Sequence, residues 1–284
     1  MAASALVSTE WLAAQLTAPD LQVLDASWHM PAAKRNPGGE FLASHIPGAR
    51  FFDIDAISDR SSPLPHMVPP PDQFAAQMQA LGVGDQTRVV VYDVHGLMTA
   101  ARAWWLLRLF GHEQVFVLDG GLPKWQAEGR PVVADAPAPP PPVAFTPRLN
   151  LHLIRDHGQV AQALAAAHQV VDARAADRFE GRAPEPRPEL ASGHMPGSRN
   201  LPWSELVDPV TKQVRAPADI RARFQAAGID LSRPLIASCG SGVTACVLAF
   251  GAYLNGAENV AVYDGSWSEW AAVPGARIAA GPAA

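Results

Sequence analysis

The sequence predicts two consecutive α/β domains, each a parallel sheet flanked by helices. Three observations support this fold class: an internal repeat, an alternation of short apolar runs with longer amphipathic segments, and a run of prolines between the two copies. A chain of 284 residues, 48% of them apolar, is long enough to form two ordinary hydrophobic cores. We expect domains at residues 1–135 and 148–284, joined by a linker at residues 136–147.

The repeat consists of four pairs of similar segments that occur in the same order in both halves. The pairs are Val23–Ala26 with Val170–Ala173, Ser44–Ala49 with Gly193–Ser198, Arg88–Asp93 with Pro234–Cys239, and Val115–Trp125 with Val260–Trp270. Similar segments in a fixed order indicate duplication. We therefore expect the two domains to share one topology.

Within each copy, β-branched and aliphatic runs alternate with segments of helical character such as Pro71–Leu81 and Pro217–Ala227. Strands that are apolar along their whole length are typical of a parallel sheet that is covered on both faces. Between the copies, Ala136–Pro142 is rich in proline, which favours extended polyproline II structure. This composition indicates a semi-rigid linker.

Charge and composition argue against several classes of function. A net charge of −5 without a basic run gives no support for nucleic acid or an anionic membrane surface as partner. No run approaches the ~18 apolar residues of a membrane helix, and Glu10 interrupts the N-terminal apolar stretch before it reaches signal-peptide length. The two cysteines, Cys239 and Cys246, form neither a disulfide framework nor a zinc pattern. We expect a cytoplasmic protein that acts on a small molecule or another protein.

Cys239 follows a predicted strand of the second copy and opens the loop Cys239–Thr244, which contains two glycines and leads into the helical segment Ala245–Phe250. Ligands of open α/β sheets bind beyond the carboxyl ends of the strands. Backbone N–H groups and the helix dipole at such a turn stabilise negative charge and favour a thiolate. We predict that Cys239 is a nucleophile, whereas Cys246 inside the apolar helix is predicted to be a core residue.

Two other interpretations of this loop are disfavoured, one by the first copy of the repeat and the other by the residues that follow the loop. Gly240–Ala245 matches the dinucleotide-binding pattern G-x-G-x-x-A, and Asp264 stands where a ribose-binding acid belongs. However, Asp264 has a counterpart in Asp119 of the first copy, which lacks the glycine pattern, so the acid is interpreted as architectural. A cysteine phosphatase requires an arginine just after the loop, but residues 244–247 are Thr-Ala-Cys-Val.

A loop with the sequence C-G-S-G-V-T in the second of two repeats resembles the 3-mercaptopyruvate sulfurtransferases of the rhodanese superfamily. Further stretches that are similar to this family are His45–Ala49, Ser58–Met67, Ala103–Trp105, Pro184–Arg187 and Tyr263–Trp270. The resemblance covers essentially the whole chain and implies two tandem rhodanese-like domains. The related thiosulfate sulfurtransferases usually carry two basic residues after the cysteine, whereas this chain has Gly240 and Ser241, which favours mercaptopyruvate as the donor.

The resemblance implies that the Cys239 thiolate takes sulfur from 3-mercaptopyruvate, leaving a persulfide on Cys239 and releasing pyruvate. The sulfur would then pass to a thiol such as thioredoxin or to cyanide, with no metal or organic cofactor. Arg178 and Arg187 match the family's substrate-binding positions, and a guanidinium fork suits a carboxylate beside a ketone. The remaining loop residues expected to bind the donor are Gly240, Gly242, Val243 and Thr244.

Ser241 and His45 match a serine and a histidine that are proposed to act together in persulfide formation in this family. The acid that would accompany this histidine falls at Lys34–Asn36, so it is absent from that position or displaced, for example to Glu40. His194 occupies the same turn of the second copy, which leaves a structural role open for His45.

Asp93 takes the place of Cys239 in the first copy, and a carboxylate cannot carry sulfane sulfur. The first domain is therefore expected to be catalytically silent and to contribute lining residues to a cleft, with His66 and Trp28 as candidates. Two alternatives remain open: a thiosulfate sulfurtransferase, and a non-catalytic persulfide relay that receives sulfur from another protein.

Overall fold

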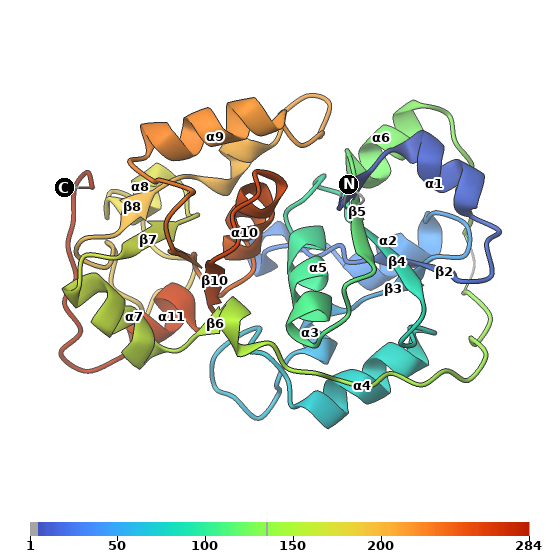
Figure 1. Cartoon of the computed structure of the whole chain (residues 1–284), viewed down its shortest axis with the longest axis horizontal. Helices are drawn as coiled ribbons and strands as arrows, with labels where there is room; N and C mark the ends of the chain where they lie inside the picture. The colour runs from blue at the N-terminus through green and yellow to red at the C-terminus, as the bar shows by residue number, and fades with distance from the viewer. Residues whose placement is uncertain (1–4, 135, 284) are drawn as a thin grey trace. The chain divides into compact units, whose positions relative to one another are not determined.

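The computed structural model describes residues 5–134 and 136–283, which form two compact units (Figure 1). The first unit contains the chain up to Arg60, Val68–Asn150 and Val207–Val214. The second contains Ser61–Met67, Leu151–Leu206 and the chain from Arg215 onward. The ends of the expected domains at residues 1, 135 and 284 lie outside the described residues.

The first unit is a five-stranded parallel sheet with the strand order β1-β5-β4-β2-β3. Its strands are β1 Leu6–Val7, β2 Leu21–Asp25, β3 Arg50–Phe51, β4 Arg88–Tyr92 and β5 Val115–Leu118. Its helices are α1 Thr9–Gln15, η1 Pro31–Ala33, α2 Pro37–Ala43, α3 Ile54–Ile57, α4 Pro71–Ala80, α5 Ala100–Leu109 and α6 Gly121–Ala127. Helix α1 begins where the Ser8 hydroxyl accepts the Trp11 N–H, a standard N-cap.

The second unit has the same arrangement, with the strand order β6-β10-β9-β7-β8. Its strands are β6 Ile154–Arg155, β7 Gln169–Asp172, β8 Arg199–Asn200, β9 Leu235–Ser238 and β10 Val260–Tyr263. Its helices are η2 Leu151–Leu153, α7 His157–Ala165, α8 Ala176–Phe179, η3 Trp203–Leu206, α9 Pro217–Ala226, α10 Ala245–Leu254 and α11 Ser266–Trp270. The predicted fold class of two α/β domains with parallel sheets is confirmed.

The central strands explain why the sequence shows continuous apolar runs. Every residue of β9 and β10 is buried, as are the last four residues of β4, because helices cover both faces of each sheet. Helix α10 is buried from Ala245 to Ala252, which accounts for the apolar stretch that contains Cys246. Among the described residues, no helix is both long and apolar enough to cross a membrane.

Two short segments belong to the unit that is formed mainly by the other half of the sequence. Ser61–Met67 is part of the second unit, and Val207–Val214 is part of the first. The first unit holds its borrowed segment through Asp119, whose carboxylate accepts the Gln213 side chain at 2.7 Å and the Val214 N–H at 2.8 Å. The units therefore do not coincide with two uninterrupted halves of the sequence.

The ends of the central strands carry different polar groups in the two sheets. In the first sheet, Asp25 lies beside Tyr92 and accepts the Ser27 N–H at 2.8 Å. In the second sheet, Asp172 lies beside Ser238, and its carboxylate pairs with Arg174. The first unit thus lacks the arginine at this position, and burial raises the pKa of Asp25 to about 6.

This shift predicts a pH dependence of stability. Between about pH 4, the ordinary aspartate value, and about pH 6, the folded state binds more protons than the unfolded state. The free energy of unfolding should therefore fall as the pH rises through this range, by about 3 kcal/mol in total. Urea unfolding of wild type and Asp25→Asn at several pH values measures the difference. Asp20→Asn is the control, because Arg88 lowers the pKa of Asp20 and its titration falls below this range. Equal slopes in wild type and Asp25→Asn would contradict the assignment.

Candidate active site

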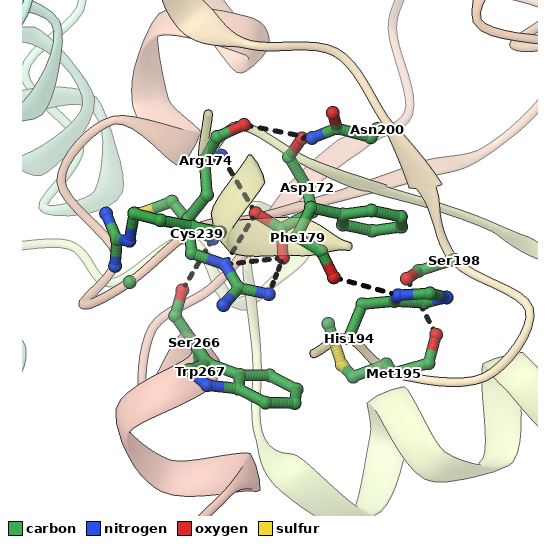
Figure 2. Close-up of polar contacts among 12 residues, drawn as sticks. Asp172, Arg174, Phe179, His194, Met195, Ser198, Asn200, Cys239, Ser266 and Trp267 are labelled. Atoms are coloured by element: carbon green, nitrogen blue, oxygen red, sulfur yellow. Dashed lines mark hydrogen bonds and ion pairs between the residues drawn. The ribbon is translucent and has the colours of Figure 1, made fainter. Parts of the chain in front are cut away.

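Cys239 follows strand β9 directly and is 2% exposed. Its backbone N–H and that of Gly242 both donate to the Ser266 hydroxyl, each at 3.1 Å, and this hydroxyl donates to the Tyr263 carbonyl at 2.7 Å. Figure 2 shows Ser266 beside Cys239. The Ser266 hydroxyl, at the start of α11, therefore connects residues 239 and 242 of the cysteine loop.

The position of Ser266 has an unusual backbone conformation, with φ at +50°. In the first unit the same position is Gly121, with φ at +55°, where an added Cβ would lie 2.3 Å from the Asp93 carbonyl oxygen. A non-glycine residue in the left-handed region is strained unless its surroundings hold it there. In the second unit, the hydrogen bonds of the Ser266 hydroxyl stabilise this residue in the left-handed conformation.

Helix α11 also fixes the carbonyl side of the loop. Trp267 N–H donates to the Cys239 carbonyl at 3.0 Å, and Ser268 donates to the Gly240 carbonyl through its N–H at 2.9 Å and its hydroxyl at 2.6 Å. In the part of the chain that the structure describes, the N–H groups of Gly240, Ser241, Val243 and Thr244 have no acceptor. The carbonyl groups of Cys239 and Gly240 thus accept hydrogen bonds from α11, whereas these backbone N–H groups remain available to bind an anion.

The corresponding loop of the first unit is occupied by a carboxylate. Asp93 Oδ1 accepts the His95 N–H at 2.8 Å, and Oδ2 accepts the N–H groups of Thr99 and Ala100 at 2.7 and 2.8 Å. Thr99 and Ala100 begin helix α5, as Thr244 and Ala245 begin α10. Backbone N–H groups of the duplicated loop therefore converge on the side chain of Asp93 in the first unit, which supports a similar capacity of the loop at Cys239 to stabilise negative charge.

The two predicted substrate arginines both reach the cysteine loop. A Cβ added to Gly240 would lie 3.3 Å from Arg178 Nη2, so this guanidinium packs against the loop. Arg187 Nη1 donates to the Ser268 hydroxyl at 3.3 Å, and the same hydroxyl holds the Gly240 carbonyl. Both arginines are partly buried, which strengthens their interaction with a bound anion.

Three further charged residues, which sequence reasoning missed, are connected to Arg178 through ion pairs. The buried Arg174 donates to Asp172 Oδ2 at 2.8 Å, and its guanidinium lies 4.4 Å from the centre of the Trp267 ring (Figure 2). Arg174 also donates to Glu185 Oε1 at 2.8 Å. Although burial disfavours the charge, the two carboxylates raise the pKa of Arg174. Two features of the sequence could have indicated these residues. Asp172 and Arg174 form a pair of opposite charges at the end of an apolar run, and Glu185 lies between the two prolines that precede Arg187.

His66, predicted only as a lining residue, hydrogen-bonds to Ser241 in the second unit. His66 Nδ1 lies 2.9 Å from Ser241 Oγ, on the borrowed segment Ser61–Met67. The histidine is buried and has φ at +60°, a conformation that is uncommon outside glycine and is held by the surrounding structure. The structure therefore gives Ser241 an imidazole partner within its own unit.

His45 has an environment that its repeat counterpart shares. His45 Nδ1 pairs with the Phe41 carbonyl at 2.7 Å and its ring stacks on Phe41; His194 Nδ1 pairs with the Phe179 carbonyl at 3.0 Å and stacks on Phe179. This matched arrangement agrees with the structural role that the sequence left open for the turn histidine. Glu40 pairs instead with His29 and Arg35.

The remaining candidates are placed as follows. Trp28, in the first unit, is 9% exposed, and its Nε1 donates to Asp55 at 2.9 Å. Cys246 is buried in α10, and its thiol donates to the Gly242 carbonyl at 3.2 Å. Across residues 5–134 and 136–283, no group of three or more histidine, cysteine or acidic side chains is placed to hold a metal ion.

The rhodanese-like domain model matches residues 8–128 and 156–273. The human 3-mercaptopyruvate sulfurtransferase is 46% identical over 94% of this chain and 91% of its own length. The mouse thiosulfate sulfurtransferase is 45% identical over 98% and 96%, respectively. The thiosulfate/3-mercaptopyruvate sulfurtransferase 1 of Arabidopsis thaliana, a mitochondrial protein by its name, is 44% identical over 95% and 76%.

Solved structures agree with this relationship. The crystal structure of the 3-mercaptopyruvate sulfotransferase SseA from Escherichia coli matches with a TM-score of 0.85 at 39% identity, covering 93% of this chain and 99% of SseA. Tum1 from Saccharomyces cerevisiae matches with a TM-score of 0.88 at 33% identity, covering 97% of both chains. The chain therefore belongs to the rhodanese family and is a sulfurtransferase built from two rhodanese-like domains.

Proposed function

We propose that this sulfurtransferase takes sulfur from 3-mercaptopyruvate, forms a persulfide on Cys239 and releases pyruvate. The relatives include proteins named for mercaptopyruvate and proteins named for thiosulfate, so family membership alone leaves the donor open. The observation that carries the choice is the cysteine loop, where Gly240 and Ser241 add no positive charge beside Arg178 and Arg187. Mercaptopyruvate is a monoanion, whereas thiosulfate is a dianion that requires more positive charge.

In the first half-reaction the Cys239 thiolate attacks the donor's sulfur. A sulfur–sulfur bond forms, the carbon–sulfur bond breaks, and its electron pair moves into the adjacent ketone to give the enolate of pyruvate. Arg178 and Arg187 bind the carboxylate and the developing enolate oxygen, because forked donors fit paired oxygens. The unpaired N–H groups of the loop stabilise the sulfur anion.

The enolate then needs one proton at carbon to become pyruvate. In our proposal the Ser241 hydroxyl, which is hydrogen-bonded to His66, delivers this proton. The imidazolium form of His66 then returns a proton to the serine oxygen and is left as neutral imidazole. In the second half-reaction an acceptor thiolate or cyanide attacks the outer sulfur. The persulfide bond breaks and the Cys239 thiolate is restored.

We expect Ser241→Ala and His66→Asn each to lower kcat/KM for pyruvate formation by about a hundredfold. Asparagine is chosen at position 66 because it tolerates the positive φ better than most residues. If the two side chains act as one unit, the double variant should be no slower than the slower single variant. Alkylation of Cys239 by iodoacetamide serves as the control and should stay near the wild-type rate. Fully multiplicative losses would show that serine and histidine act separately.

The donor is tested by measuring pyruvate release from mercaptopyruvate beside thiocyanate formation from thiosulfate and cyanide. We expect a higher kcat/KM for mercaptopyruvate. A higher value for thiosulfate would make the protein a thiosulfate sulfurtransferase. Negligible turnover of both donors, with a persulfide still appearing on Cys239 from a protein donor, would identify a relay.

The sulfur acceptor and the cellular compartment are the remaining parts of the proposed function. We propose a thiol acceptor such as thioredoxin, or cyanide, and no metal or organic cofactor. Neither Cys239 nor Cys246 forms a disulfide, which supports a reducing compartment such as the cytoplasm. Fractionation of cells that express the intact chain, with detection by antibody, tests the location.

A further inference from the structure

The substrate arginine Arg178 is already paired with a buried carboxylate. Arg178 Nη2 lies 2.5 Å from Glu185 Oε2, and the Glu185 side chain is only 2% exposed. The other oxygen of Glu185 lies 2.8 Å from Nη1 of Arg174, which in turn pairs with Asp172. The four side chains alternate in sign and run from the end of β7 to the cysteine loop.

This chain of ion pairs contains two carboxylates and two guanidinium groups, so it carries no net charge. Arg187 stands outside it. Within the described residues Arg187 has no acidic partner, and its guanidinium donates to the neutral Ser268 hydroxyl. The cysteine loop is therefore flanked by two arginines but by a single uncompensated positive charge.

We propose that Glu185 is a specificity-determining residue, which neutralises Arg178 and thereby matches the site to a donor with one negative charge. This inference rests on the proposed function, since it takes Arg178 and Arg187 as the groups that bind the donor. The Arg178 fork still supplies directed hydrogen bonds, but its charge is offset within the protein. A dianion would need a second uncompensated cation.

Burial makes Glu185 effective in this role. The carboxylate is shielded from solvent, so salt screens its field less than that of a surface acid. If a unit charge on the protein and a unit charge on the donor are ~7 Å apart, with an effective dielectric constant of ~30, their interaction changes the dissociation constant of the donor by about tenfold. The second charge of thiosulfate experiences this field in addition to the first, whereas mercaptopyruvate has only one charge.

The test compares Glu185→Gln with Glu185→Asp in the full chain. Glu185→Gln removes the charge with little change in shape, and we expect it to raise the ratio of kcat/KM for thiosulfate to that for mercaptopyruvate by about tenfold. Glu185→Asp keeps the charge and shortens the side chain. It should leave the ratio near the wild-type value even if both donors react more slowly. Equal ratios in Glu185→Gln and wild type, or equal shifts in Gln and Asp, would overturn the inference.

If Glu185→Gln does not fold, Arg178→Gln provides a second test, because it removes a positive charge instead of a negative one. Arg178→Gln alters a partly exposed side chain and leaves the buried Glu185–Arg174 pair intact, so we expect it to fold. It removes a cation, and the thiosulfate-to-mercaptopyruvate ratio should fall by a similar factor. An unchanged or increased ratio would contradict the charge argument. If the wild type itself released no pyruvate from mercaptopyruvate, the proposed function would fail, independently of the response of these ratios.

Discussion

Replacement of Cys239 by serine is expected to abolish sulfur transfer, with kcat falling to the level of the uncatalysed reaction. A serine hydroxyl in the same cradle cannot form a persulfide, and the covalent route has no other carrier at the loop. The measurements are pyruvate release from mercaptopyruvate and intact-protein mass spectrometry after donor treatment. Wild-type protein should gain one sulfur on Cys239, and the variant should gain none.

Cys246→Ser is the matched control. Cys246 lies seven residues further along, inside the buried helix α10, and its thiol is directed at the Gly242 carbonyl. A serine can make the same hydrogen bond, so most of the activity should remain. Sulfur found on Cys246, or full turnover by Cys239→Ser, would reject Cys239 as the sulfur carrier.

Arg174→Met is expected to lower the free energy of unfolding by about 3–5 kcal/mol. Methionine leaves the carboxylates of Asp172 and Glu185 buried without their shared guanidinium, and breaking a buried ion pair from one side is strongly destabilising. The Gly193 carbonyl also loses its donor at 2.8 Å. Urea unfolding followed by circular dichroism measures the change.

Arg182→Met provides the comparison at the surface. Arg182 also pairs with a carboxylate, that of Glu180, but its side chain is 63% exposed. Solvent screens such a pair, and we expect a change within about 1 kcal/mol. Similar losses in the two variants would show that burial of the Arg174 network contributes little to stability.

The fold was predictable because the repeat and the apolar runs are properties of neighbouring residues. Strands β9 and β10 are buried along their length, and this leaves a continuous apolar signal in the sequence. The cysteine loop was predictable for the same reason, since the strand end, the glycines and the start of α10 lie within one short stretch.

The partners of the site residues were harder to predict because they depend on distant parts of the chain. Ser241 and His66 are separated by 175 positions, and no local pattern distinguishes His66 from His45 as the partner. Arg174 and Glu185 were missed for a different reason. Charged residues are seldom fully buried, so a sequence pattern gives them little weight until both partners are seen together.

The borrowed segments have a consequence for synthesis on the ribosome. Domains generally fold in order as the chain emerges, the N-terminal one first. Here the first unit includes Val207–Val214, so it lacks one of its segments until about half of the second half of the chain has been translated. The Asp119 carboxylate can accept its hydrogen bonds only after Gln213 and Val214 have been translated. Conversely, Ser61–Met67 is translated early but can pack only when the second unit has formed. The two units are therefore completed late and in overlapping stages of synthesis, and Ser241 can form its hydrogen bond to His66 only after residue 241 has been translated.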